Sequence, residues 1–199
     1  LRLIAGFLEP NAGKVLLKGE DITGVPPYKR PVNTVFQKYA LFPHLNVFEN
    51  VAFGLRLKKL DEETIRRKVR NMLEVVGLKG FERRSISQMS GGQQQRVAAA
   101  RALVTDPTMI MADEPTGALD SKSARLLLES LEALNRRLRA TVLMVTHDSF
   151  AASYTSRVLF IRDGKIFTEL RRGDTDRREF FDRIMEVVAM MGGEGSDAL

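Results

Sequence analysis

The sequence has 199 residues, of which 44% are hydrophobic, which is enough for one domain with a substantial core, with or without an inserted subdomain. It contains no cysteine, which excludes disulfides and thiolate metal sites, and no apolar run approaches the roughly 18 residues that span a bilayer. The net charge of +6 suits a phosphate ligand, an anionic membrane surface or simply a solvated basic face, and no stripe of interleaved basic and aromatic residues points to nucleic acid.

Short apolar segments followed by polar residues or glycine predict strands. The predicted strands cover residues 15–17, 32–36, 109–112, 141–145 and 157–161. The third and fourth are continuously apolar, which is typical of parallel strands that are covered on both faces. After the fifth, Asp163 and Gly164 predict a tight hairpin turn into residues 165–167, because both residue types accept a positive φ.

Helical spacing dominates between the second and the third of these strands. A helix is predicted from Asp61 to Gly77, with apolar residues at every third or fourth position, and another is predicted to follow Ser90. A further helix is predicted over residues 123–138, where leucines form most of one stripe.

The alternation of helices with single apolar strands predicts the fold class. It favours an α/β fold with a parallel sheet. The predicted α/β core consists of residues 1–38 and 105–199, and the helical block, residues 39–104, reads as a subdomain inserted between two core strands.

Two adjacent carboxylates, Asp113 and Glu114, follow a predicted strand. The carboxyl ends of parallel strands are where doubly wound folds bind their ligands. Neighbouring carboxylates repel each other unless a cation or a phosphate-bound metal compensates their charge. The pair therefore indicates a metal or phosphate site, and the alternative is a solvated acidic turn.

The segment Ser90-Gly91-Gly92 begins a predicted helix. Serine is a good helix N-cap, and glycines let backbone N–H groups come close to an anion. The positive end of the helix dipole also favours phosphate at this place. The alternative is an ordinary capped helix that follows a loop.

Three further polar residues stand next to predicted elements. Gln37 follows residues 32–36, His147 follows residues 141–145, and Asp120 ends the turn before the last helical segment of the core. Taken singly, each has an ordinary structural explanation, as a strand end, a structural histidine or a turn residue.

Five motifs in chain order carry a resemblance to a known family. They are Thr34-Val35-Phe36-Gln37, Ser90-Gly91-Gly92-Gln93-Gln94-Gln95-Arg96, Ile110-Met111-Ala112-Asp113-Glu114-Pro115, Gly117-Ala118-Leu119-Asp120 and Val145-Thr146-His147-Asp148. In this order they resemble the Q-loop, signature, Walker B, D-loop and H-loop of the ATP-binding subunit of an ABC transporter. The resemblance implies a P-loop NTPase (RecA-like) core that binds ATP and Mg²⁺ and hydrolyses ATP.

The resemblance also implies a role for each residue at the nucleotide's own site. Asp113 would hold Mg²⁺, and Glu114 would polarise the attacking water. Gln37 would sense both the Mg²⁺ and that water, and His147 would contact the γ-phosphate. His44, the other histidine, looks like a surface residue without a chemical task.

The remaining motif residues would act across a head-to-tail dimer. Ser90, Gly91, Gly92 and Gln93 would bind the γ-phosphate of ATP held by a second ATP-binding subunit, and Asp120 would line the interface. The aromatic-rich residues 39–53 would pack the helical subdomain, receive a membrane-spanning permease subunit, or do both. The family implies a peripheral position on the cytoplasmic face of a bacterial cell membrane.

One part of the family pattern is absent. No G-x-x-x-x-G-K-[ST] phosphate loop, the Walker A segment, occurs in the 199 residues, so the resemblance predicts an N-terminally truncated chain that is inactive alone. In the family, the strand before that loop is central to the sheet. Residues 109–112 and 141–145 would therefore flank it, expose unpaired edges and make the isolated chain prone to aggregate.

The subfamily and the function stay open at the level of the sequence. Residues 1–57 look like polyamine-importer ATPases of the spermidine and putrescine type, whereas residues 112–199 are similar to antimicrobial-peptide (bacitracin-type) exporter ATPases. The main hypothesis is an ATP-hydrolysing transport subunit. The alternatives are a non-transport ABC ATPase and a binding or regulatory fragment that has lost catalysis.

Overall fold

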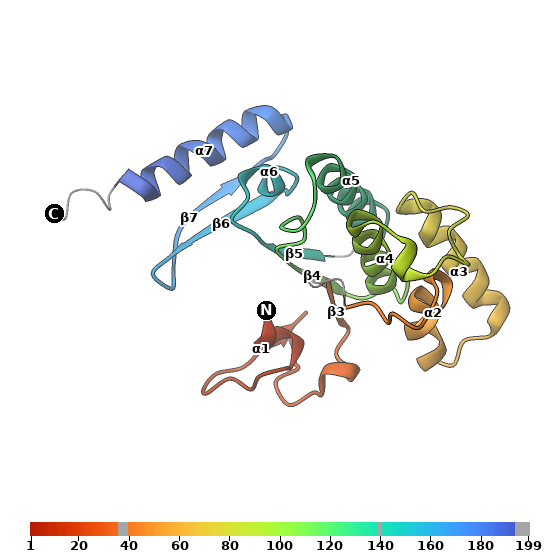
Figure 1. The fold of residues 1–199 in the computed structure, drawn as a ribbon. Helices are drawn as coiled ribbons and strands as arrows, with labels where there is room; N and C mark the ends of the chain where they lie inside the picture. The colour runs from red at the N-terminus through yellow and green to blue at the C-terminus, as the bar shows by residue number, and fades with distance from the viewer. Residues whose placement is uncertain (36–39, 139–140, 194–199) are drawn as a thin grey trace. The chain divides into compact units, whose positions relative to one another are not determined.

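A computed structural model describes residues 1–35, 40–138 and 141–193. Its contacts divide the chain, drawn in Figure 1, into two units, Leu1–Val145 and Thr146–Leu199. Each unit has a buried apolar cluster of its own. The predicted limits of a helical subdomain, residues 39–104, remain a prediction. Among the described residues, no helix combines the length and the apolar character needed to cross a bilayer.

A parallel sheet organises the first unit. Its strands are β3 (Val32–Val35), β4 (Met109–Asp113) and β5 (Thr141–Val145), in the order β3-β4-β5. The central strand β4 is covered on both faces, because Ile110, Met111 and Ala112 are fully buried. The predicted α/β fold with a parallel sheet is confirmed.

The expectation that β4 and β5 would expose unpaired edges towards a strand missing between them is wrong for this structure. They pair directly in parallel, from Met109 opposite Thr141 to Asp113 opposite Val145. This pairing satisfies backbone N–H and C=O groups that an apolar strand would otherwise leave without partners. The expected cover on both faces of β5 is also wrong, because Thr141 and Val145 are exposed.

Four longer helices of the first unit begin after polar N-cap residues. They are α2 (Val47–Leu57), α3 (Glu62–Val75), α4 (Gly91–Leu103) and α5 (Ser121–Leu138), with a short 3₁₀ turn at Ile86–Gln88 before α4. Asn46, Asp61 and Ser90 each accept a backbone N–H at the start of their helix. Helix α4 packs against α2, α3 and α5, and also against β3. The predicted helices after Asp61 and Ser90 are confirmed.

The N-terminal segment is held by one buried arginine. It contains α1 (Arg2–Ala5), the antiparallel pair β1 (Leu16–Leu17) and β2 (Glu20–Asp21), and a 3₁₀ turn at Pro27–Lys29. Arg30 donates to the carbonyl oxygens of Leu3 and Ile4 at 2.9 Å, of Thr23 at 2.8 Å and of Val25 at 2.7 Å. These bonds fasten α1 to the loop that precedes β3.

The second unit is a hairpin with a helix packed on it. Its elements are α6 (Ser149–Ala152), β6 (Arg157–Arg162), β7 (Lys165–Arg171) and α7 (Arg177–Gly193). The hairpin is antiparallel, and its tip has positive φ at Asp163 (51°) and Gly164 (74°), which confirms the predicted turn. Phe180 and Ile184 of α7 pack on Phe160 of β6.

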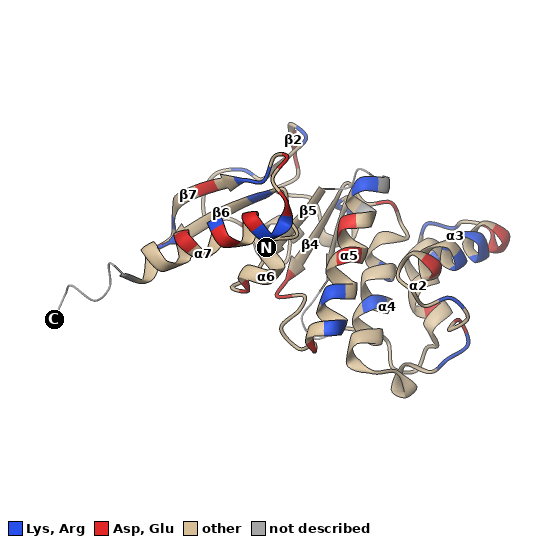
Figure 2. Cartoon of the chain, turned by 90° about the horizontal axis from the view of Figure 1, so that it is seen from above, with Lys and Arg blue, Asp and Glu red and all other residues tan. Residues whose placement is uncertain are grey.

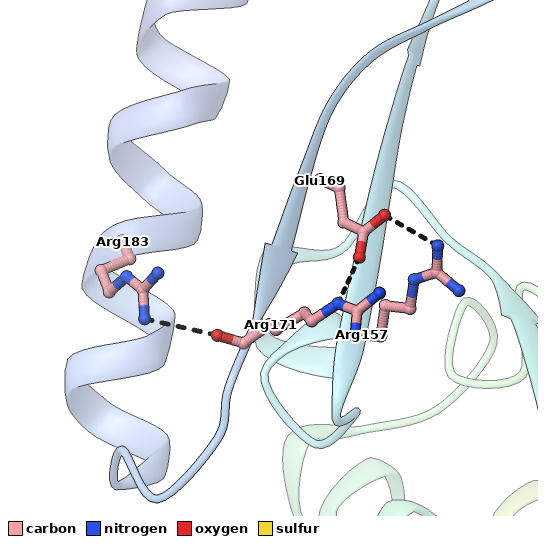
Figure 3. A network of polar contacts seen from close by, with 4 residues as sticks. All are labelled: Arg157, Glu169, Arg171 and Arg183. Carbon is pink, nitrogen blue, oxygen red and sulfur yellow. Dashed lines mark hydrogen bonds and ion pairs between the residues drawn. The ribbon is translucent and has the colours of Figure 1, made fainter.

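An ion-pair network crosses the hairpin of this unit (Figure 3). Glu169 accepts from Arg157 at 2.7 Å and from Arg171 at 2.6 Å, and these two guanidinium groups lower the pKa of Glu169 to about 2. Arg183 of α7 reaches the carbonyl oxygen of Arg171 at 3.5 Å. Exposed pairs of this kind add little stability individually.

Candidate functional site

The acidic pair lies at the carboxyl end of the central strand. Asp113 is the last residue of β4 and its side chain is exposed, while Glu114 is half-buried. The Glu114 N–H donates to the Val145 carbonyl at 2.9 Å, and the Glu114 carbonyl accepts from the N–H of Gly117 at 3.1 Å. These bonds turn the chain sharply out of the sheet and hold Glu114 at a φ of 43°.

A left-handed backbone at a glutamate is unusual. Such a conformation costs about 1–3 kcal/mol and persists only where surrounding contacts determine it; it occurs often at functional sites. The next residue is Pro115, and a residue before proline is further restricted towards extended conformations. The turn at Glu114 is therefore maintained by tertiary contacts against its local preference.

Asp120 caps the helix that follows this turn. Its carboxylate accepts from the backbone N–H groups of Lys122 at 3.1 Å and Ser123 at 3.0 Å. Hydrogen bonds from Ser123, from its side chain and then from its backbone, lower the pKa of Asp120. The cap explains why α5 begins at Ser121, two residues before the predicted start at residue 123. The interface role of Asp120 stays a prediction.

The start of α4 is closed by a reciprocal cap. The Ser90 hydroxyl accepts from the Gln93 N–H at 3.3 Å, and the Gln93 side chain accepts from the Ser90 N–H at 3.0 Å. Gly91 follows as the first helical residue and is half-buried. The predicted N-cap is confirmed, and phosphate binding at this helix start stays a prediction.

The second signature glycine has a packing role that the sequence interpretation missed. A Cβ atom on Gly92 would lie 2.4 Å from the Ser123 hydroxyl oxygen and 2.6 Å from the Ser123 Cβ. Only glycine therefore allows the first turns of α4 and α5 to come so close. At this contact the N-terminus of α5 is capped by the Asp120 carboxylate and that of α4 by the Ser90 hydroxyl.

Gln95 is a site residue that the sequence interpretation used only as part of a motif. It is fully buried on α4, and its side-chain amide donates to the Pro115 carbonyl at 3.1 Å. Its position three residues after Gly92 and three before Ala98 is the spacing of one helix face. That spacing was the available signal that this glutamine points inward.

Gln37 lies outside the described residues, so its role stays a prediction. The segment that follows it is anchored by α4, because Arg101 donates to the Ala40 carbonyl at 2.8 Å and lies over the Phe42 ring at 5.4 Å. Burial lowers the pKa of Arg101. The Phe42 and Phe53 rings pack 4.7 Å apart, so packing accounts for these aromatic residues. Docking of a permease subunit there stays a prediction.

His147 stands at the beginning of the second unit. Its side chain is exposed, and the next residue, Asp148, caps α6 by accepting from the Phe150 N–H at 2.9 Å. The predicted contact of His147 with a γ-phosphate stays a prediction. His44 is exposed in the first unit, as expected from the sequence.

The donor set at the strand end fits a nucleotide-bound magnesium ion. Magnesium prefers oxygen ligands and is commonly held by one or two carboxylates together with phosphate oxygens and water. Asp113 offers an exposed carboxylate of this kind. Within the described ranges, no group of three or more histidine, aspartate or glutamate side chains is placed to hold a metal ion.

Sequence comparisons identify a family and individual relatives. The family model described as "ABC transporter" matches residues 1–117. The spermidine/putrescine import ATP-binding protein PotA of Desulfitobacterium hafniense is 50% identical over 167 residues, which are 83% of this chain and 48% of that protein. The same protein of Acetivibrio thermocellus is 52% identical over 83% of this chain and 47% of its own length.

The chain therefore spans about half the length of the curated relatives it matches. The likeness to these importer proteins extends well beyond residues 1–57, to which the sequence interpretation had confined it. Among solved structures, the ATP-binding cassette MJ0796 in a dimeric post-hydrolysis state bound to ADP and Pi matches with a TM-score of 0.74. It is 32% identical and covers 85% of this chain and 78% of that one.

Proposed function

The chain belongs to the ABC transporter family, and on that premise we propose that it is the ATP-binding subunit of a polyamine importer of the spermidine–putrescine type. ATP hydrolysis at this subunit drives the movement of the polyamine through membrane-spanning permease subunits. The observation that carries the proposal is the grouping of Asp113 and Glu114 at the end of β4 with the glycine-started helix α4, joined through the bond from Gln95 to Pro115.

At the subunit's own nucleotide, Glu114 polarises the attacking water and Asp113 helps to hold Mg²⁺, which supplies positive charge beside the phosphates. His147 contacts the γ-phosphate, and Gln37 contacts the water and the metal. Held left-handed at the end of β4, the Glu114 backbone directs the chain away from the sheet. This keeps its carboxylate at the strand end, where ligands of such sheets bind.

A second copy completes the site in a head-to-tail dimer. Ser90, Gly91, Gly92 and Gln93 offer helix N–H groups to the γ-phosphate of the ATP on the partner subunit, and Asp120 lines the interface. The dimeric cassette among the similar structures supports this arrangement. The subunit acts as a peripheral protein on the cytoplasmic face of the cell membrane, and nucleic acid is not among its partners.

Acidic and basic positions occur together on two helices of the first unit. Helices α3 and α5 each carry Lys or Arg positions together with Glu positions, whereas the charged positions of α4 are all arginines (Figure 2). Export of an antimicrobial peptide, a non-transport ATPase and a regulatory fragment remain alternatives. Import is preferred because the likeness to PotA proteins covers 83% of the chain.

The test compares Glu114→Gln with Glu63→Gln in the intact gene product. Glu63 is an exposed carboxylate on α3 and controls for the same chemical change. We expect Glu114→Gln to bind ATP but to hydrolyse it about 10²–10⁴-fold more slowly, because the group that polarises water is lost. Glu63→Gln should hydrolyse ATP like the parent protein.

Transport is measured separately, as uptake of radiolabelled spermidine and putrescine by cells that lack the gene and carry either variant. Restored uptake with Glu63→Gln and none with Glu114→Gln supports the proposal. Undiminished ATP hydrolysis in Glu114→Gln contradicts the enzymatic part. Hydrolysis without any polyamine uptake contradicts the substrate class and leaves the ATPase assignment standing.

A further inference from the structure

A single helix connects the two halves of the proposed site within one chain. The first turn of α4 carries Ser90, Gly91 and Gly92, which face the partner's nucleotide in the proposed dimer. Gln95 follows Ser90 by about 1.4 turns and donates its side-chain amide to the Pro115 carbonyl at 3.1 Å. Pro115 directly follows Glu114, the residue that serves the subunit's own nucleotide.

The bond from Gln95 is made to the residue that follows Glu114, and Glu114 has an unfavourable backbone conformation. Glu114 has a φ of 43° and precedes a proline, so local preference favours its leaving this conformation. Contacts that hold it include the bonds with Val145 and Gly117 on its own peptide groups and the bond from Gln95 on the next one. A change at Gln95 therefore removes one of the contacts that hold the turn after Glu114.

The other side-chain amides that meet α4 lead elsewhere. Gln94 donates to the carbonyl oxygens of Ile86 and Met89 in the loop before the helix. Asn33 of β3 donates to the Ala102 carbonyl in the last turn of the helix and to the Thr105 hydroxyl just beyond its end. Among the described hydrogen bonds, the one from Gln95 is the only side-chain bond from α4 to the turn at Glu114.

We propose that Gln95 is a positioning residue that makes the placement of Glu114 depend on the state of α4. Binding of the partner's γ-phosphate at Ser90 to Gly92 fixes the helix, and the fixed helix holds Pro115 and hence Glu114 in place. Hydrolysis at one nucleotide is thereby coupled to occupancy of the signature segment by the other. This inference rests on the proposed function, because it assigns the signature and Glu114 to two different nucleotides.

The experiment compares Gln95→Met with Asn33→Leu in the intact gene product. In each variant an apolar side chain of similar size replaces a side-chain amide. Gln95 lies on α4 and binds Pro115 in the turn at Glu114, whereas Asn33 lies on β3 and binds the end of α4. We expect Gln95→Met to lower kcat about 10–100-fold with KM for ATP unchanged, since a small misplacement of a reacting group has an effect of that size. Asn33→Leu should lower the melting temperature and keep kcat.

Two further variants separate positioning from general destabilisation. In a Glu114→Gln background, adding Gln95→Met should cause no further loss, because both changes disable the same group. In Gln95→Glu, burial raises the carboxyl pKa, and the protonated acid donates to Pro115 as the amide does. Its kcat relative to the parent protein should therefore recover as the pH falls. This variant also keeps the test valid if Gln95→Met does not fold.

Equal losses of kcat in Gln95→Met and Asn33→Leu at equal melting temperature overturn the inference. So does a further loss on top of Glu114→Gln, or a Gln95→Glu activity whose ratio to the parent does not change with pH. If Glu114→Gln itself hydrolyses ATP normally, the proposed function fails. If Glu114→Gln is inactive and Gln95→Met keeps its kcat, only the coupling fails.

Discussion

The turn at Glu114 and the hairpin tip at Asp163 share a left-handed backbone but differ in what holds them. At the tip, Asp163 has a φ of 51° and Gly164 a φ of 74°, and a Cβ on Gly164 would meet nothing within 4 Å. At the end of β4, Glu114 has a φ of 43° and is followed by Pro115, which is buried. One turn is open to solvent and the other is embedded in the first unit.

The difference shows where each conformation comes from. Asp-Gly is a preferred pair for a tight hairpin turn, so the tip forms from its own two residues. Glu-Pro has no such preference, and the conformation of Glu114 is imposed by bonds with Val145 and Gly117 and by the anchoring of Pro115 from Gln95. A turn that is held by distant contacts can be changed from a distance, whereas a turn made by its own residues cannot.

The largest loss of stability near the turn at Glu114 is expected from Gly92→Ala. The added methyl would lie 2.4 Å from the Ser123 hydroxyl oxygen, so α4 and α5 must separate beside the turn. Overpacking of this kind lowers the free energy of unfolding by about 1–3 kcal/mol. Urea unfolding of the intact protein measures the loss.

The matched control for that change is the double variant Gly92→Ala with Ser123→Gly, which removes the clashing side chain and should recover part of the loss. Full additivity of the two changes would contradict the contact as the cause.

A smaller effect, a gain in stability, is expected when glycine replaces either of the two acidic residues with a left-handed backbone, Glu114 and Asp163. Glu114→Gly removes the left-handed penalty of roughly 1–2 kcal/mol but adds chain entropy worth roughly 0.5–1 kcal/mol, so we expect a net gain of up to about 1.5 kcal/mol together with loss of ATP hydrolysis. Asp163→Gly should change stability less, because aspartate tolerates this backbone. A larger gain for Asp163→Gly would contradict the contrast between the two turns.

The smallest effect concerns the hairpin that Asp163 and Gly164 close. Arg157 and Arg171 lower the pKa of Glu169 to about 2 from 4.5, so its stabilising contribution is present above the unfolded-state pKa and is lost as the pH falls from 4.5 towards 2. Thermal melts across this range should show a slope that Glu169→Gln flattens. Because the pair is exposed, high salt should also flatten it; a slope insensitive to both changes would contradict this origin.

Local features of the fold could be predicted from the sequence. The cap at Ser90, the helix after Asp61 and the turn at Asp163 and Gly164 depend on residues within a few positions of one another, and the structure confirms them. The acidic residues at the end of β4 were also expected, because an apolar strand followed by carboxylates is visible in the sequence itself.

Features that depend on distant residues could not be predicted. The contact of Gly92 with Ser123 and the bond of Gln95 with Pro115 join parts of the chain whose distance apart no local pattern reports. The direct pairing of β4 with β5 was missed for the same reason, since strand order follows from competition among all strands for partners. Most of the site's support is of this non-local kind.

Arg30 shows that hydrogen bonds between distant residues can constrain the amino acid at one position and leave its partner positions free to vary. All of its described acceptors are backbone carbonyl oxygens, at Leu3, Ile4, Thr23 and Val25, which almost any amino acid at those positions would supply equally well. A lysine has three donors on one nitrogen and cannot reach four separate acceptors, whereas the planar guanidinium has five donors in a fixed arrangement. Substitutions can accumulate at the acceptor positions without cost to these bonds, whereas a substitution at position 30 removes all four of them.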